Sequence, residues 1–429
     1  MDIKQICVNA GDAAVKMAAL DSETKNNALA RIALALIENK DRITAANNDD
    51  LKRSEEEQLA SPLLKRLKFD EKKINDAVEG IKSLIGLEEP VGKTLLSTML
   101  DDGLELYKVT CPIGVIGIIF ESRPDALVQI STLCLKSGNS VLLKGGREAR
   151  ETNRVLADII EEASVAAGLP KGWISLLESR DDVNEMLKMD EYIDLLIPRG
   201  SNQFVRYIMD NSRIPVMGHA DGICHVYVDS CADVDMAVRV TVDSKTQYVA
   251  VCNAAETLLV NEAVAGRFLP ALKKEFDKKN VEIFGDEGTR GIIAAKPASE
   301  ADWATEYLDY TISVKLVADV DEAIKHINTY GSGHTDSIVT SDRANALKFM
   351  NLVDSGNVFW NASTRFSDGF KYGFGAEVGI STSKLHARGP VGLDGLTSYK
   401  YKLIGDGHTV EDYAANKKSF KHIKLDKTI

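Results

Sequence analysis

Apolar residues in the first part of the chain recur at helical spacing. The run 28–36 (ALARIALAL) places its large aliphatic residues three and four positions apart. This spacing predicts amphipathic helices over roughly the first 95 residues. Ser22 or Thr24 is the expected cap of the helix that holds this run. The chain therefore begins with helices that need an apolar partner to pack against.

From Asp101 onward, short apolar strands alternate with helical segments. An extended segment at 104–109 comes first, and apolar strands separated by helices follow it. Such alternation predicts βαβ units around a parallel sheet. A second α/β series begins near Val234, and the segment 396–404 alternates like an edge strand. The expected strands of the two series are 115–120, 141–143, 173–177, 195–197, 224–228, 256–260, 281–283, 313–317 and 358–360.

Charge and length exclude several classes of protein. The formal net charge of the 429 residues is -12, which repels nucleic acid and anionic membrane surfaces. An anionic small substrate would therefore need a local basic pocket. The longest apolar run, 111–120, contains a proline and two glycines and falls short of the roughly 20 residues that a membrane helix needs.

The cysteines and the N-terminal residues indicate a reducing compartment. Six cysteines are present, at positions 7, 111, 134, 224, 231 and 252, and none forms a CxxC pair. The first residues are interrupted by charges, so no signal-peptide pattern is present. We therefore expect free thiols and a cytoplasmic location.

Cys252 is the first candidate for chemistry. It lies between a predicted helix and a predicted strand, where a loop can present a nucleophile. A thiolate attacks carbonyl groups, and helix N-termini or cations near it favour its formation. The alternative is a cysteine that serves as a small core residue, and composition alone favours that interpretation.

Two strand ends are candidates for anion binding. Gly200 and Ser201 separate a predicted strand from a predicted helix, where backbone N–H groups face an anion such as a cofactor phosphate. An ordinary turn is the alternative. Lys144 at another strand end would meet a ribose or a 2′-phosphate, unless it is a solvated lysine.

A metal site is not expected from the histidines and cysteines around 219–231. His219, Cys224, His225 and Cys231 lack the paired spacing of zinc sites. Cys224 and His225 are neighbours on a predicted strand, so their side chains face opposite sides.

The segment 361–390 is a candidate binding loop. It is rich in Gly, Ser, Thr and aromatic residues and shows little regular structure. Arg365, Lys371, His386 and Arg388 bring positive charge to an acidic chain. A substrate with a phosphate or carboxylate group would explain that charge.

Long segments of the chain resemble the γ-glutamyl phosphate reductase family, also called glutamate-5-semialdehyde dehydrogenases. The resemblance covers nearly the whole chain in the family's order. It rests on CPIGVIGIIFESRPDA (111–126), VLLKGGREA (141–149), IPRGSNQFVRYI (197–208), QYVAVCNAAETLLV (247–260) and the stretch 361–401.

The resemblance implies the aldehyde dehydrogenase fold, with two Rossmann-like parallel-sheet α/β domains and a small β flap for oligomerisation. The expected parts are a cofactor-binding domain (1–100 and 111–225), a catalytic domain (226–392) and bridging segments (101–110 and 393–429). A homodimer or a tetramer is the expected assembly.

The resemblance also implies an activity. It is the NADPH-dependent reduction of L-glutamate 5-phosphate to L-glutamate 5-semialdehyde, in proline biosynthesis, through a thioester on Cys252. The backbone N–H groups of Cys252 and Asn253 would stabilise the oxyanion. Lys144, Gly200, Ser201 and Glu306 would contact NADPH, and the candidates for binding the substrate's phosphate or carboxylates are Arg123, Arg365 and Arg388.

Three segments depart from related patterns. Val249 replaces the proline that the family usually has after Tyr248. The stretch 218–223 (GHADGI) lacks the water-activating glutamate of hydrolytic aldehyde dehydrogenases, as a reductase that protects a thioester requires. The stretch 121–124 (ESRP) replaces their oxyanion-binding asparagine motif, which leaves the side-chain oxyanion donor unassigned.

Two other functions stay open. An acylating aldehyde dehydrogenase would use acyl-coenzyme A, and phosphate dependence of the reverse reaction separates the two enzymes. A catalytically inactive protein of the same fold could lose its nucleophile freely, so the retained Cys252 counts against it.

Overall fold

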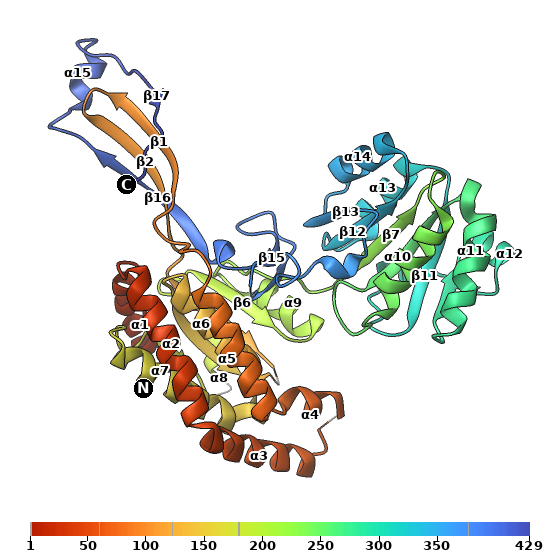
Figure 1. Cartoon of the computed structure of the whole chain (residues 1–429), viewed down its shortest axis with the longest axis horizontal. Helices are drawn as coiled ribbons and strands as arrows, with labels where there is room; N and C mark the ends of the chain where they lie inside the picture. Colours follow the sequence, from red (N-terminus) through yellow and green to blue (C-terminus); the bar gives the residue numbers. More distant parts are fainter. Residues whose placement is uncertain (1, 60, 122, 179–180, 376) are drawn as a thin grey trace.

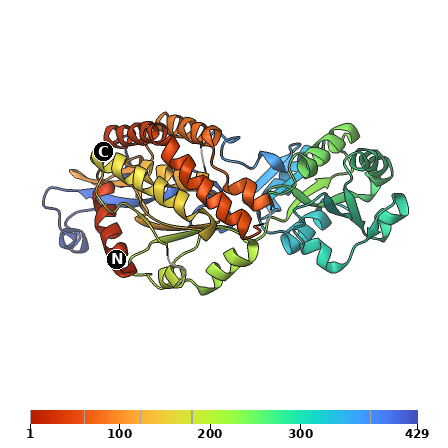
Figure 2. The ribbon, with the colours of Figure 1, turned by 90° about the horizontal axis from the view of Figure 1, so that it is seen from below.

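The computed structural model describes residues 2–59, 61–121, 123–178, 181–375 and 377–429, and these fold into three parts (Figure 1). Two α/β units lie side by side, and an antiparallel flap extends away from the first (Figures 1 and 2). No helix within the described residues is long and apolar enough to cross a membrane.

The first unit is built on a parallel sheet with the strand order β5-β4-β3-β6. Helices α2, α5, α6 and α7 bury an apolar cluster against one face, and α1, α8 and α9 cover the other (Figure 2). Its elements are α1 (Ile3–Met17), α2 (Ser22–Glu38), α3 (Lys40–Glu56), α4 (Ser61–Leu67), α5 (Glu71–Ile85), β3 (Val115–Phe120), α6 (Pro124–Lys136), β4 (Ser140–Gly145), α7 (Arg150–Ala166), β5 (Ile174–Leu176), α8 (Asp181–Met186), β6 (Leu195–Arg199) and α9 (Asn202–Asn211).

The predicted helices at the start of the chain are confirmed, but the residue that caps α2 differs from the prediction. Leu29, Ile32 and Leu36 of α2 are fully buried, as their spacing predicts. Asp21, rather than Ser22 or Thr24, caps this helix, because its carboxylate accepts a hydrogen bond from the Thr24 backbone N–H at 2.8 Å.

The second unit holds a seven-stranded parallel sheet with the order β10-β9-β11-β8-β7-β12-β13. Helices α10 and α11 pack on one face, and α13 and α14 on the other. Its elements are β7 (Cys224–Val228), α10 (Val234–Thr246), β8 (Ala255–Asn261), α11 (Glu262–Asp277), β9 (Glu282–Gly285), α12 (Glu287–Ile292), β10 (Lys296–Pro297), β11 (Thr311–Val317), α13 (Val320–Tyr330), β12 (Thr335–Val339), α14 (Arg343–Leu352) and β13 (Asn357–Trp360). The expectation of two parallel-sheet α/β units is confirmed.

Two segments cross the boundaries expected from the sequence. β7 pairs with β8 and β12, so the second sheet begins at Cys224 rather than at 226. Further along, Val378 and Val391 pack in the apolar core of the first unit. They flank the short antiparallel pair β14 (Gly379–Ser381) and β15 (Gly389–Val391). The segment 378–391 therefore joins the two units.

The flap is a four-stranded antiparallel sheet with the order β16-β2-β1-β17. It joins β1 (Thr94–Asp101) and β2 (Leu104–Pro112) to β16 (Thr397–Ile404) and β17 (Ile423–Lys424), which come nearly 300 residues later, and α15 (Val410–Ala414) lies beside it (Figure 1). Strand β1 begins before the bridging segment that the sequence suggested. Strand β16 lies at one edge of the flap.

Candidate active site

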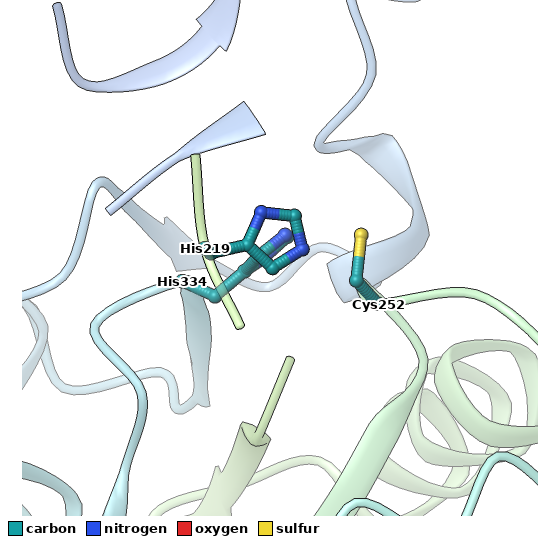
Figure 3. A group of neighbouring side chains, drawn as sticks. All are labelled: His219, Cys252 and His334. Atoms are coloured by element: carbon teal, nitrogen blue, oxygen red, sulfur yellow. The ribbon is translucent and has the colours of Figure 1, made fainter. Parts of the chain in front are cut away.

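Three chemically reactive side chains meet at one edge of the second sheet. Cys252 precedes β8, His219 precedes β7, and His334 precedes β12. These strands are parallel neighbours, so their amino ends lie at the same edge. The ligand atoms of the three side chains all lie within 4.8 Å of one another (Figure 3).

The backbone of Cys252 packs directly on Gly222. A methyl group at position 222 would lie 2.5 Å from the Cα and 2.6 Å from the Cβ of Cys252, closer than carbon atoms approach. The Cys224 thiol also donates a hydrogen bond to the Cys252 carbonyl oxygen at 3.2 Å. Glycine at 222 therefore permits the position of Cys252.

The loop 361–390 supports the nucleophile from the other side. The Asn253 side chain is buried and donates to the Ser367 carbonyl oxygen at 2.6 Å. The Thr364 hydroxyl donates to the Asn253 carbonyl oxygen at 2.7 Å. Among the described residues, no backbone acceptor takes the N–H of Cys252 or of Asn253. Both groups thus remain available for an oxyanion.

His219 and His334 differ in their surroundings. His334 is fully buried, its Nδ1 lies 2.8 Å from the Thr335 hydroxyl, and its Nε2 has no partner within the described residues. His219 is half-buried, and its Nδ1 lies 2.8 Å from the Ile380 carbonyl oxygen. Burial lowers the pKa of His219. The two rings meet edge to face, with centroids 4.8 Å apart.

Of the four residues weighed for metal from the sequence, only His219 joins this group. His225 is buried, with its Nδ1 2.8 Å from the Asp336 carboxylate, and Cys231 is exposed on the surface. The partners of His219 are Cys252 and His334, which come from distant positions in the sequence.

Asp221, in the stretch that replaces the hydrolytic motif, is held by the first unit. Its carboxylate accepts from Asn202 Nδ2 at 2.9 Å and pairs with Arg206 at 2.5 Å. Asn202 also donates to Glu306 at 2.6 Å. Asn202 follows Ser201 and begins α9, so this bond brings Glu306 near the Gly200–Ser201 turn.

A cavity of about 410 Å³ opens in the first unit at the carboxyl ends of β3, β4 and β5. Lys144, Arg147 and Arg150 line it, together with Glu121. The Glu121 carboxylate accepts from the Ser201 backbone N–H at 3.1 Å. This carboxylate occupies the place where the sequence predicted an anion from the cofactor.

Arg199, at the end of β6, lies within electrostatic range of Cys252. Burial, and then the like charge of Arg123, lower the pKa of the Arg199 guanidinium, and the acidic groups of Glu377 and Cys252 oppose this shift. Arg199 lies against Gly379, because a methyl group there would come within 2.6 Å of its Nη1 atom. Arg123 also pairs with Asp125 at 3.0 Å, and Ser122 lies outside the described residues.

The other two predicted arginines lie at different places. Arg365 donates to the Gln247 side chain at 2.9 Å, beside the start of the nucleophile loop. Arg388 pairs with Asp354 at 2.9 Å and also donates to the Asp354 carbonyl oxygen at 2.8 Å. Arg123 and Arg199 therefore act on each other electrostatically, whereas Arg388 is held by a carboxylate.

A fully buried ion pair joins the elements that precede and follow Cys252 in the chain. Lys245 near the end of α10 bonds Glu256 of β8 at 2.6 Å, and neither side chain is exposed. Burial raises the pKa of Glu256 to about 7 although Lys245 opposes the shift. The pair links the two elements that flank Cys252.

Sequence reasoning missed His334 and did not single out Arg199 or Glu121. A signal was present for His334, because it follows the turn GSG at 331–333 and precedes the short β-rich run TDSIV. No local pattern marks Arg199, because an arginine at the end of an apolar strand is usually a surface residue.

Comparisons with known proteins agree with this geometry. The model of the Aldehyde dehydrogenase family matches residues 1–290 and 311–400. A protein of Ruminiclostridium cellulolyticum named gamma-glutamyl phosphate reductase is 79% identical over 429 residues, which are 100% of this chain and 99% of that protein. A protein of the same name from Acetivibrio thermocellus is 70% identical over 427 residues, again 100% and 99% of the two chains.

A solved structure shows the same arrangement. The crystal structure of gamma-glutamyl phosphate reductase from Thermotoga maritima superposes with a TM-score of 0.93 at 42% identity, covering 95% of this chain and 100% of that one. The resemblance found in the sequence is thereby confirmed. The chain belongs to the aldehyde dehydrogenase family, and within it to the group of the γ-glutamyl phosphate reductases.

Proposed function

We propose that this chain is a cytoplasmic, NADPH-dependent reductase that converts L-glutamate 5-phosphate to L-glutamate 5-semialdehyde and phosphate in proline biosynthesis. The observation that carries the proposal is the placement of Cys252 on Gly222, in a chain 79% identical to a protein named gamma-glutamyl phosphate reductase. The six free thiols accord with a reducing compartment.

The first chemical step is attack of the Cys252 thiolate on the γ-carbonyl carbon. The C–S bond forms, the backbone N–H groups of Cys252 and Asn253 donate to the oxyanion, and the C–O bond to phosphate breaks. Such donors each contribute roughly 10²–10³-fold in rate. The product of this step is a thioester on Cys252.

NADPH, when bound, supplies the hydride that reduces this thioester. Cys252 then holds a thiohemiacetal, whose collapse breaks the C–S bond and returns the thiolate with release of the semialdehyde. Because the oxyanion forms at the same carbon in both steps, the same two N–H groups serve both.

Protection of the thioester from water follows from Asp221. It is the only carboxylate in the stretch that replaces the water-activating motif, and Asn202 and Arg206 hold it. Asn202 binds its Oδ1 and Arg206 its Oδ2, so both carboxylate oxygens already have partners in the first unit and are not directed to a water at Cys252. The thioester therefore persists until reduction.

Arg199 and Arg123 are the cations that best fit the phosphate group. Their charges interact with each other, and the charge of Cys252 acts on Arg199. A phosphate between two guanidiniums relieves their repulsion and gains charge-assisted hydrogen bonds. Arg365 stays a candidate for a substrate carboxylate, whereas Arg388 has its carboxylate partner within the chain.

The residues of the first unit fit an NADPH cofactor. The cavity beside β3, β4 and β5 carries the three cations Lys144, Arg147 and Arg150, which suit the 2′-phosphate that distinguishes NADPH from NADH. Glu306 and the Gly200–Ser201 turn lie together through Asn202; Glu306 would hold the ribose, and the turn would bind a cofactor phosphate in place of the Glu121 carboxylate. These residues bind and orient the cofactor toward Cys252.

The assembly is proposed to be a homodimer or a tetramer. Strand β16 lies at the edge of the flap, and Tyr399, Tyr401 and Leu403 on it are at least half exposed. An apolar edge strand of this kind pairs with another chain unless it is protected. Light scattering of the purified protein measures the mass, and a monomer at micromolar concentration would refute this assembly.

The reverse reaction tests the function. Purified protein is mixed with NADP⁺ and glutamate 5-semialdehyde, and absorbance of the reduced cofactor is followed with and without inorganic phosphate. We expect turnover that depends strictly on phosphate. Turnover without phosphate would show that water hydrolyses the thioester, and dependence on coenzyme A would identify an acylating dehydrogenase instead.

A further inference from the structure

The group of His219, Cys252 and His334 has the composition of a zinc site. Zinc binds thiolate sulfur and imidazole nitrogen, and sites with three protein ligands keep a fourth position for water. The three ligand atoms lie within 4.8 Å of one another, on segments that precede three neighbouring strands (Figure 3).

An independent observation points to a ligand at this place. His334 is fully buried, yet its Nε2 atom has no partner among the described residues. Leaving a buried polar nitrogen unpaired costs about 1–3 kcal/mol. Its Nδ1 is already held by Thr335, so Nε2 is the atom that remains for a ligand.

His219 has a matching arrangement. Its Nδ1 bonds the Ile380 carbonyl oxygen, which orients the ring and leaves Nε2 for the site. Metal-binding histidines commonly have such a backbone partner on the other nitrogen. Figure 3 draws the His219 ring in front of the His334 ring, with the Cys252 thiol to their right.

We propose that this group binds one Zn²⁺ ion reversibly and thereby blocks the nucleophile. Zn–S and Zn–N bonds of about 2.3 and 2.0 Å in a tetrahedron put ligand atoms about 3.5 Å apart. The ligand atoms all lie within 4.8 Å of one another, so they need to approach by no more than about 1 Å, which side-chain rotation supplies.

Binding is balanced by loss of a proton. The Cys252 thiol gives up its proton as the Zn–S bond forms, and removal of zinc by a chelator returns the thiol. The nucleophile is neither oxidised nor consumed. The consequence for catalysis rests on the proposed function, because a sulfur bound to zinc cannot attack the acyl phosphate.

The first test measures binding and does not depend on turnover. Zn²⁺ is titrated into the full-length, metal-free protein in competition with a chromophoric chelator, and Co²⁺ is used in parallel as a spectroscopic probe. We expect one high-affinity zinc per chain and a thiolate-to-cobalt charge-transfer band. Alkylation of Cys252 by iodoacetamide should stop with zinc and resume with EDTA, as read by peptide mass spectrometry.

Substitutions locate the ion. Cys252→Ser and His219→Gln should each weaken zinc binding by roughly tenfold or more, and the cobalt charge-transfer band should vanish in Cys252→Ser. His334→Gln should act likewise, provided that circular dichroism shows the wild-type fold. His219→Gln is the safer variant because that side chain is only half-buried. Cys231→Ser and His422→Gln change exposed residues of the same types and should leave the affinity unchanged.

Three results would overturn the site: no zinc bound at micromolar concentration, unchanged affinity in Cys252→Ser and His219→Gln, or alkylation of Cys252 that zinc does not slow. A protein that binds zinc here but shows no phosphate-dependent turnover would refute the proposed activity and leave the metal site standing. A protein that shows phosphate-dependent turnover but binds no zinc here would refute the metal site alone.

Discussion

Gly222 lies against the backbone of Cys252, so close that a methyl group at 222 would come 2.5 Å from the Cys252 Cα. The contact joins the stretch before β7 to the loop before β8. It explains why a glycine stands in the part of the chain where hydrolytic relatives carry their water-activating motif. The position of the nucleophile thus depends on a residue that contributes no functional group.

Gly222→Ala should lower turnover strongly without unfolding the protein. The added methyl group must push the Cys252 loop away, and displacements of about 1 Å at a reacting atom cost roughly 100-fold in rate. The measurement is kcat/KM in the phosphate-dependent assay, with circular dichroism to check the fold. Gly266→Ala, on α11 with open space at its Cβ, is the matched control. Wild-type turnover of Gly222→Ala would show that the loop adapts.

Cys252→Ala should abolish reduction, by roughly a thousandfold or more, and leave the fold intact. Without sulfur no thioester forms. Cys7→Ala, Cys134→Ala and Cys231→Ala should matter far less. Burial raises the pKa of the Cys7 thiol to about 11 and that of Cys134 as well, so neither supplies a thiolate at neutral pH. Mass spectrometry of the enzyme with substrate but no NADPH should detect an acyl adduct in wild type and none in Cys252→Ala.

Arg199→Met should lower kcat/KM for phosphate about 10–100-fold. This decrease corresponds to the loss of one or two hydrogen bonds to a charged group. Gly379→Ala should produce a similar but smaller defect, because its methyl group would displace the Arg199 guanidinium. Arg154→Met, which removes an exposed arginine paired with Glu178, is the control. If Arg199→Met kept the wild-type KM for phosphate, the guanidinium would have no role in binding it.

Lys245→Met should destabilise the fold by about 3–5 kcal/mol, because it leaves Glu256 buried without its partner. Burial already raises the pKa of Glu256 to about 7, and loss of Lys245 raises it further. A carboxyl group whose pKa is higher in the folded than in the unfolded protein stabilises the fold at pH values below its unfolded pKa. This contribution is lost as the pH rises toward the folded pKa. The deficit of Lys245→Met should therefore grow as the pH rises through 7, as measured by urea unfolding.

The double variant Lys245→Met/Glu256→Leu separates charge from packing. It replaces both buried charges with apolar side chains, so it should recover much of the stability lost in Lys245→Met. A double variant as unstable as the single one would mean that the pair acts through shape and not through its charges.

His326 should make the fold sensitive to acid. It is 4% exposed and lies between Trp303 and Tyr330, and burial, then His225 and Lys315, lower its pKa from 6.5 to about 3. A histidine whose pKa is lower in the folded than in the unfolded protein stabilises the fold at pH values above its unfolded pKa. This contribution is lost as the pH falls toward the folded pKa. The loss between pH 6.5 and 3 amounts to at most about 5 kcal/mol.

His326→Phe removes this titration and keeps an aromatic ring in place. Its free energy of unfolding should therefore fall less steeply than that of wild type as the pH drops from 6.5 toward 4. His422→Gln, at an exposed histidine, serves as the control and should follow the wild-type curve. Identical slopes for wild type and His326→Phe would show that His326 is protonated in the folded protein.

Local patterns in the sequence determined the helical start and most of the parallel strands, and they singled out Cys252 as the proposed nucleophile. Helical spacing buries one face of α2, and runs such as β3 are apolar throughout because both faces of their sheet are covered. Cys252 follows from its neighbours in the chain and from the family resemblance. These features depend on residues close together in the sequence.

Strand β12 escaped sequence analysis because its core is polar. Thr335, Asp336 and Ser337 are fully buried there, and Asp336 is satisfied by His225. A buried polar strand is stable only when its partners come from other strands, and no local pattern shows them. Helix α14, which follows it, was missed with it.

Tertiary structure alone decided which residues surround Cys252. The order β8-β7-β12 places His219 and His334 beside the nucleophile, although 115 positions separate the two histidines. Arg199 reaches the site from the other α/β unit, and Glu121 reaches the Ser201 turn from a neighbouring strand. Strand order and the packing of the two units set these distances, because the free energy that fixes them comes from contacts between residues distant in the chain.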